Sequence, residues 1–194
     1  MVRQNSENGG ANRTPIAGPA GRSGNDEAPA KAPPLKPQSS GGMNADRNLI
    51  EALTNSKVFQ EYERAFTEAT GLPIALRAVE SWQLPHHGHR NESPFCSLVL
   101  ETSRACASCL SVQEKLSAGA TQAAHTVNCP AGLCDTAVPV RLGDRLIGFL
   151  QTGQVFRKTP TREQFQRTLK LVAEWGVRVD PAKLKHAYFS TRVV

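Results

Sequence analysis

The order of helical and extended segments predicts an α+β domain with a small, mainly antiparallel sheet and helices on one or both faces. Apolar residues at helical spacing alternate with short extended runs, without a continuous βαβ order. The runs 136–142 and 145–155 flank Gly143-Asp144, which is a strong two-residue hairpin signal. Further strands are expected at 73–84 and 125–129.

The first 45 residues differ in composition from the rest of the chain. They hold 7 of the 15 glycines and 6 of the 13 prolines, and no aromatic residue. Such a segment buries too little apolar surface to offset the entropy of ordering it. We therefore expect residues 1–45 to be a disordered tail and residues 46–190 to form one domain of about 150 residues, enough for a single core.

Helices are expected at 46–70, 94–102, 103–118, 161–175 and from 181 onward. The helix expected at 46–70 is interrupted at 54–56, where Ser56 can cap a second helical stretch. Gly71 and Pro73 end this second stretch. This helix can also pair with its copy, and we expect a homodimer. Pro139 indicates an edge position or a bulge within its strand.

Composition narrows the class of protein. The net charge is +6 and the pI is about 9.3, but the basic residues are scattered and no nucleic-acid-binding motif is present. The N-terminus lacks the apolar core of a signal peptide, and no run approaches the length of a membrane span. We therefore expect a cytoplasmic protein with no membrane contact and with reduced thiols.

The five cysteines are the densest chemical feature of the chain. They all lie in one stretch, at Cys96, Cys106, Cys109, Cys129 and Cys134. Three interpretations stay open: buried free thiols, a zinc or iron–sulfur site, and a thiol–disulfide switch at the helical pair Cys106 and Cys109. His86, His87 and His89 lie in a polar loop, which explains them as well as metal binding does.

Little in the sequence indicates an enzyme. No paired carboxylates, phosphate-binding glycine loop or nucleophile elbow is present. His125 and Cys129 lie on one short strand, where their side chains would point in different directions. A thiol-dependent enzyme is therefore the third-ranked interpretation, and we expect no enzymatic activity.

Several short motifs resemble the PocR sensory domain. They are Ala69-Thr70-Gly71, Phe95-Cys96, Arg104 to Cys106, the turn from Cys129 to Leu133, Val138-Pro139-Val140, Gly148-Phe149 and Gly153-Gln154-Val155. The resemblance covers residues 46–190 and is most specific from 129 to 154. It implies a PAS-like fold that senses small organic molecules, with simple hydrocarbon derivatives as proposed ligands. It also implies an output region, either an AraC-type helix-turn-helix or a signalling region, that follows the helix at 181–194. The protein would contact DNA only through that output region.

The cysteines depart from the pattern of the family. Val99 stands where many members carry a second cysteine, whereas Cys109 and Cys134 occupy positions where many members have other residues. If the family cysteines assemble a metal site, Cys109 can replace the missing ligand. The predicted ligand set is then Cys96, Cys106, Cys109 and Cys129, with Cys134 as the spare.

The favoured interpretation is a small-molecule-sensing regulatory domain. Its ligand is expected between the sheet and the helices that cover it, with a relay through the terminal helices. The candidate lining residues are Phe95, Asp135, Phe149, Gln151 and Gln154. Gln151 is the most informative, because a polar residue amid apolar neighbours is costly to bury without a partner. The alternative for Gln151 is the solvated face of its strand, and the alternative function is a metal or redox sensor that uses the cysteines.

Overall fold

The computed structural model describes residues 40–81, 83–89 and 91–194. The predicted tail therefore lies outside the described residues up to residue 39, whereas residues 40–45 belong to the first helix. The elements in chain order are α1 (Ser40–Thr54), α2 (Lys57–Thr70), β1 (Ile74–Ala78), α3 (Pro94–Val99), α4 (Ser103–Gly119), β2 (His125–Asn128), β3 (Cys134–Leu142), β4 (Arg145–Val155), α5 (Arg162–Glu174) and α6 (Pro181–Phe189).

Local capping explains where α2 begins and ends. The Ser56 hydroxyl accepts a hydrogen bond from the backbone N–H of Phe59 at 3.2 Å, as the sequence predicts. At the other end Gly71 adopts a φ of 67°, and its N–H donates to the Thr67 carbonyl at 2.7 Å. The segment expected as one interrupted helix is therefore two helices, α1 and α2.

The other long helices begin at side-chain caps of the same kind. Thr102 accepts a hydrogen bond from Ala105 at 3.3 Å at the start of α4. Thr161 and Asp180 cap α5 and α6, and Pro181 occupies the first turn of α6. These short polar side chains satisfy backbone N–H groups that a helix end leaves without partners.

The described residues form a four-stranded sheet with the order β1-β4-β3-β2, and every neighbouring pair is antiparallel. The α+β prediction is confirmed. The strand expected at 73–84 is shorter, because Ala78 is the last of its residues to pair with β4, opposite Gly148. Gly143, with a φ of 60°, forms the predicted turn of the β3–β4 hairpin with Asp144. Pro139 lies on β3 beyond the last residue that pairs with β2, so it occupies an edge position.

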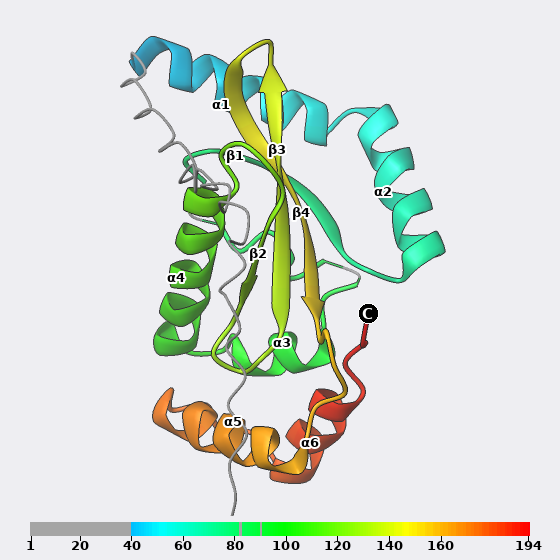
Figure 1. Cartoon of the computed structure of the whole chain (residues 1–194), viewed down its shortest axis with the longest axis vertical. Helices are drawn as coiled ribbons and strands as arrows, with labels where there is room; N and C mark the ends of the chain where they lie inside the picture. Colours follow the sequence, from blue (N-terminus) through cyan, green and yellow to red (C-terminus); the bar gives the residue numbers. More distant parts are fainter. Residues whose placement is uncertain (1–39, 82, 90) are drawn as a thin grey trace, which may run out of the picture. The chain divides into compact units, whose positions relative to one another are not determined.

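Helices cover both faces of the sheet. Successive side chains of β4 point to opposite faces, so each face offers residues for a helix to pack against. On one face Gly148 lets Ile50 of α1 approach closely: a Cβ on Gly148 would lie 2.8 Å from the Ile50 side chain. On the other face Phe149 packs with Leu116 of α4 and with Ala120, which follows the last residue of that helix. We refer to this second face, which also carries Ala137 and Leu146, as the α4 face (Figure 1).

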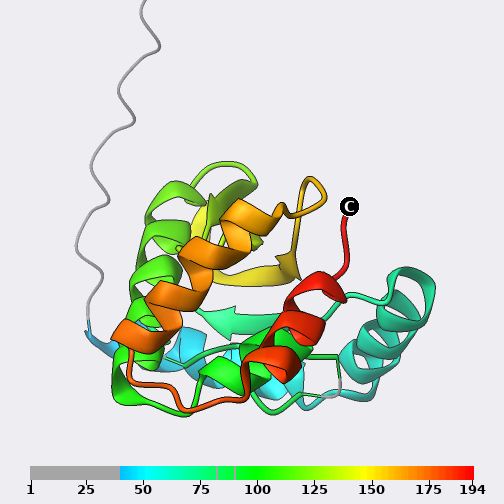
Figure 2. The same cartoon turned by 90° about the horizontal axis from the view of Figure 1, so that it is seen from below.

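A second core cluster joins α3, α5 and α6 to the end of β4. Tyr188 is fully buried at its centre, and its ring lies 5.1 Å from Phe95, 4.9 Å from Phe156 and 5.3 Å from Phe165, centroid to centroid. Figure 2 shows α5 and α6 side by side at this end of the sheet. The aromatic cluster thus fixes the terminal helices against the strand that carries Gln151.

The last residues return to the sheet. The Phe156 N–H donates to the Arg192 carbonyl at 2.8 Å, and the Val194 N–H donates to the Phe156 carbonyl at 2.9 Å. Together they form an isolated parallel bridge between Phe156 and Val193. Among the described residues no helix combines the length and the apolar character that a membrane crossing needs.

Candidate functional site

The α4 face carries a row of side chains that the antiparallel register brings together. Arg77 of β1 lies opposite Phe149 of β4, and Gln151 lies on the same side of β4 two pairs further along. Above them α4 contributes Ser117 and Gln113. These polar side chains come from three elements and meet beneath the helix.

A hydrogen-bond network holds the Arg77 guanidinium in place. Its Nε donates to Gln151 Oε1 at 3.0 Å, and its Nη2 donates to the Ser117 hydroxyl. The guanidinium carbon lies 5.0 Å from the centroid of the Phe149 ring, a distance at which cation and ring attract. Burial lowers the pKa of Arg77 from its ordinary value.

Two amide atoms beside this network have no hydrogen-bond partner in the described structure: Gln151 Nε2 and Gln113 Oε1. Gln151 is 0% exposed and Gln113 is 8% exposed. The alternative that Gln151 lies on a solvated strand face is therefore wrong. A buried donor and a buried acceptor without partners are costly, and such atoms are typical of sites that a ligand or water completes.

Three of the thiols, Cys96, Cys109 and Cys129, lie close to one another and to Asp135. Burial raises the pKa of the Cys96 thiol well above its ordinary value, and nearby Cys129, Asp135 and Cys109 raise it further. Burial, with Cys129 and Asp135, likewise raises the pKa of Cys109 to about 12. Burial and Asp135 raise the pKa of Cys129 to about 11, although backbone hydrogen bonds from residues 131–133 oppose the shift. These three thiols are protonated at neutral pH and are weak nucleophiles.

The other two cysteines take different positions. The Cys106 thiol donates to the Leu100 carbonyl at 3.5 Å and lies near Cys109. Cys134 is buried at the start of β3, and all five cysteines are free thiols. The structure thus groups three of the four predicted metal ligands with Asp135 and leaves Cys106 at the edge.

No three His, Cys, Asp or Glu side chains in the described part of the chain are arranged to hold a metal ion. The four-cysteine site stays a prediction. In the histidine loop, His87 Nδ1 lies 3.1 Å from Glu92 Oε1, whereas His86 is buried.

Asp135 and Gln154 connect the thiol cluster to the end of β4. Burial raises the pKa of Asp135 to about 6, against the effect of a hydrogen bond from the Gln154 N–H at 3.0 Å. Gln154 has a φ of 57°, which is unusual for a residue with a side chain. Its Oε1 accepts a hydrogen bond from the Ser93 N–H at 2.7 Å. Gly153 is needed here, since a Cβ would lie 2.3 Å from Asp135 Oδ1.

A cavity of about 180 Å³ lies next to Gln154. Its walls come from the end of α2, the start of α3, the end of β4 and the C-terminal segment. Ser93 and Thr191, both buried, line it, and their hydroxyl oxygens are 3.3 Å apart. Gln154 lines this cavity, whereas the residues of the Arg77 network are not part of its walls.

The structure separates the five predicted lining residues into three places. Phe149 and Gln151 belong to the Arg77 network, Asp135 and Gln154 lie at the far end of β4, and Phe95 packs in the aromatic cluster. The sequence did not single out Arg77, Gln113 and Ser117. Arg77 gave a signal, because it is the one charged residue in the strand Ile74–Ala78.

Residues 52–194 match the sequence model of a family described as the sensory domain found in PocR. The match spans most of the chain, and the chain therefore belongs to this family of sensory domains. No curated protein and no solved structure matches the chain.

Proposed function

We propose that this chain is a ligand-sensing regulatory domain without enzymatic activity. The ligand is a small organic molecule bound at the α4 face, where it completes the network of Arg77, Gln151 and Gln113. The observation that carries the proposal is the pair of buried amide atoms without partners, Gln151 Nε2 and Gln113 Oε1. Protonated, weakly nucleophilic thiols are consistent with a binding domain rather than a thiol-dependent enzyme.

Phe149 supplies the apolar wall of the proposed site and Gln151 its polar contact. Gln154 would sense the ligand through its strand β4, and Asp135 of β3 through the hydrogen bond that it accepts from Gln154. Phe95 would sense it through its helix α3, which also carries Cys96. These five residues are the proposed ligand-responsive set.

A chain of hydrogen bonds supports a relay to the terminal segment. Asp135 accepts from Gln154, Gln154 accepts from Ser93, and the Ser93 hydroxyl meets the Thr191 hydroxyl. Thr191 in turn donates to the Ala187 carbonyl of α6 at 3.0 Å. A ligand with different affinities for two arrangements of this chain would shift their populations. In the proposed role, an output region beyond α6 then regulates transcription in the cytoplasm and alone contacts DNA.

The test is thermal unfolding of the full chain with small alcohols, diols and acids, each at about 10 mM. A ligand that binds only the folded state must raise the Tm. Gln151→Met should abolish the shift, and Gln166→Met, at an exposed position on α5, should leave it intact. Absence of a Tm shift with every compound would contradict the proposal.

The second candidate is a metal or redox sensor that uses Cys96, Cys106, Cys109 and Cys129 with zinc or an iron–sulfur cluster. The proximity of three of these thiols favours it, although their present arrangement holds no metal. Metal analysis and thiol titration of anaerobically purified protein test it, with Cys109→Ser compared with Cys134→Ser. Bound zinc or iron with four unreactive thiols would support the site, whereas five reactive thiols without metal would exclude it.

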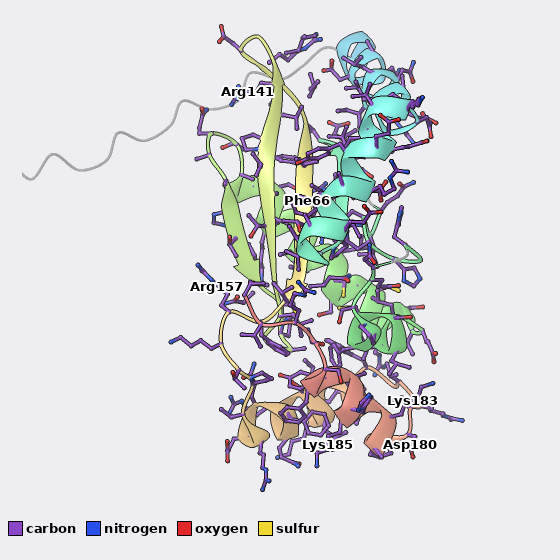
Figure 3. All side chains as sticks on the ribbon, turned by 90° about the vertical axis from the view of Figure 1, so that its right-hand side faces the viewer. Phe66, Arg141, Arg157, Asp180, Lys183 and Lys185 are labelled. Carbon is purple, nitrogen blue, oxygen red and sulfur yellow. The ribbon has the colours of Figure 1, made fainter. Side chains whose placement is uncertain are left out.

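We also propose a homodimer formed through α2. No residue of α2 is buried, and its apolar stripe includes Val58, which is 79% exposed, and Tyr62, which is 45% exposed. Figure 3 looks onto this helix, with Phe66 labelled. In an antiparallel pair of α2 helices, the large Phe59 would face the small Ala69 of the second copy, so the two surfaces fit in size.

A further inference from the structure

The guanidinium of Arg77 is a buried charge with neutral partners. Arg77 is 6% exposed, and its hydrogen bonds go to Gln151, to the Ser117 hydroxyl and, at 3.5 Å, to the Ser81 carbonyl. The ring of Phe149 adds a fourth neutral neighbour. None of these groups carries the negative charge that a buried cation normally faces.

No carboxylate in the described ranges lies within ion-pair distance of Arg77. Burial alone accounts for the lowered pKa of its guanidinium, with no contribution from a nearby acid. A contrasting case lies on α1, where Asp46 is 5% exposed and its Oδ1 lies 2.8 Å from Nη2 of Arg145. That buried carboxylate has its counter-charge in the fold, and Arg77 lacks one.

The atoms around Arg77 indicate what would compensate its charge. Gln151 Nε2 is a donor without a partner, on the same side chain that accepts from Arg77. Two kinds of donor, guanidinium and amide, can therefore converge on one anionic oxygen group. Gln113 Oε1 is an acceptor without a partner. Gln113 lies one turn before Ser117 on the same side of α4, and its main-chain carbonyl accepts a hydrogen bond from the Ser117 hydroxyl at 2.8 Å.

We propose that the molecule sensed at the α4 face is a small carboxylic acid that carries a hydroxyl group. Its carboxylate pairs with the Arg77 guanidinium and accepts from Gln151 Nε2, and its hydroxyl donates to Gln113 Oε1. Phe149 and Leu116 contact its short carbon chain. The inference rests on the proposed sensing function and gives that function a chemical class of ligand.

The probes are sodium lactate, its neutral amide lactamide, and 1,2-propanediol, in which a hydroxymethyl group replaces the carboxylate. Sodium chloride at the same ionic strength is the salt control. We expect lactate to raise the Tm of the full chain by about 3–5 °C at tenfold its Kd, and the two neutral probes to give no shift. Equal shifts with lactate, lactamide and the diol would overturn the carboxylate inference and leave the sensing function standing.

Gln151→Glu locates the site, because it places a carboxylate of the chain next to Arg77. This variant should have a higher Tm than the natural protein and no response to lactate. Arg77→Met should also lose the response, and Arg167→Met, at an exposed position on α5, should keep it. A full lactate response in Gln151→Glu would place the acid elsewhere and overturn the inference, even if Arg77→Met fails to fold. Absence of a shift with lactate would overturn the inference as well, whereas the wider panel of alcohols, diols and acids decides the sensing function.

Discussion

Arg77 Nε donates to Gln151 Oε1 across two strands, at 3.0 Å, and joins residues 74 positions apart in the sequence. The bond runs diagonally, since the register places Arg77 opposite Phe149 and Ala75 opposite Gln151. It orients the guanidinium toward α4 and leaves the second amide atom of Gln151 free for another partner. Sheet register therefore determines the chemistry of the α4 face.

Removing this acceptor should destabilise the fold. Gln151→Leu leaves a buried, charged donor without its partner, and we expect a loss of about 2–3 kcal/mol in the free energy of unfolding. Urea denaturation measures it, with Gln166→Leu on the exposed side of α5 as the control. A change below about 0.5 kcal/mol would show that water replaces the amide, and the network would then not be a buried one.

His86 should make the fold sensitive to acid. Burial, with a smaller effect of His89, lowers the pKa of His86 to about 4 from the ordinary 6.5. The stability that its neutral form contributes is fully present above pH 6.5 and is lost as the pH falls through 4. Between pH 7 and pH 4, the free energy of unfolding of the natural protein should fall by about 2–3 kcal/mol more than that of the His86→Leu variant.

Chemical denaturation across this pH range measures the effect. The exposed neighbour in the same loop supplies the control, His87→Gln. If the free energy of unfolding changed with pH in the same way in the natural protein and in His86→Leu, His86 would become charged in the folded state without loss of stability.

The backbone at Gln154 should favour glycine. Its φ of 57° costs about 1–2 kcal/mol for a residue with a Cβ and almost nothing for glycine. Gln154→Ala and Gln154→Gly both lose the acceptor for the Ser93 N–H, so their difference isolates the backbone term. We expect the glycine variant to be more stable than the alanine variant by about 1 kcal/mol in urea denaturation. The reverse order would mean that the segment abandons the left-handed conformation.

The Tyr188 hydroxyl should contribute to the aromatic cluster. It donates to the Ala131 carbonyl at 2.8 Å in a fully buried setting. Tyr188→Phe should lower the free energy of unfolding by about 1–2 kcal/mol, because the carbonyl loses its best partner. The chain offers a matched control in its other tyrosine, Tyr62→Phe, at an exposed position. Equal effects of both substitutions would contradict a special role for this hydrogen bond.

The α2 helix should carry the dimer contact. Tyr62→Glu places a charge in its apolar stripe, and we expect monomer in sedimentation or light-scattering measurements at concentrations where natural protein is dimeric. Arg64→Glu changes an exposed residue on the opposite side of the same helix and should leave the dimer intact. A dimer that survives Tyr62→Glu would place the interface elsewhere.

The fold was predictable where local signals and tertiary pairing agree. The strand expected at 145–155 is β4 residue for residue, because the Gly143-Asp144 turn sets its start. The first strand was predicted too long, since residues 79–84 have extended-type sequence but the described residues among them, 79–81, 83 and 84, have no partner on β4. A strand ends where pairing ends, and a single sequence does not show the register.

The candidate site was predictable in part for the same reason. Gln151 stood out as a polar residue among apolar neighbours. Arg77, Gln113 and Ser117 join it only through sheet register and the packing of α4, so no local pattern marks them as a group. Cys106 lies three positions before Cys109 on one helix, yet its thiol bonds the Leu100 carbonyl, a contact that spacing alone does not reveal.

The bridge between Phe156 and Val193 makes β4 a mechanical link. The middle of this strand bears Phe149 and Gln151, and Phe156, the residue that follows its end, is bonded through both its N–H and its carbonyl to the final segment of the chain. In the proposed sensing function, a displacement at Gln151 would therefore reach the terminal segment through only a few residues of one strand. The buried amide and the end of the chain would then move as two ends of one connected element.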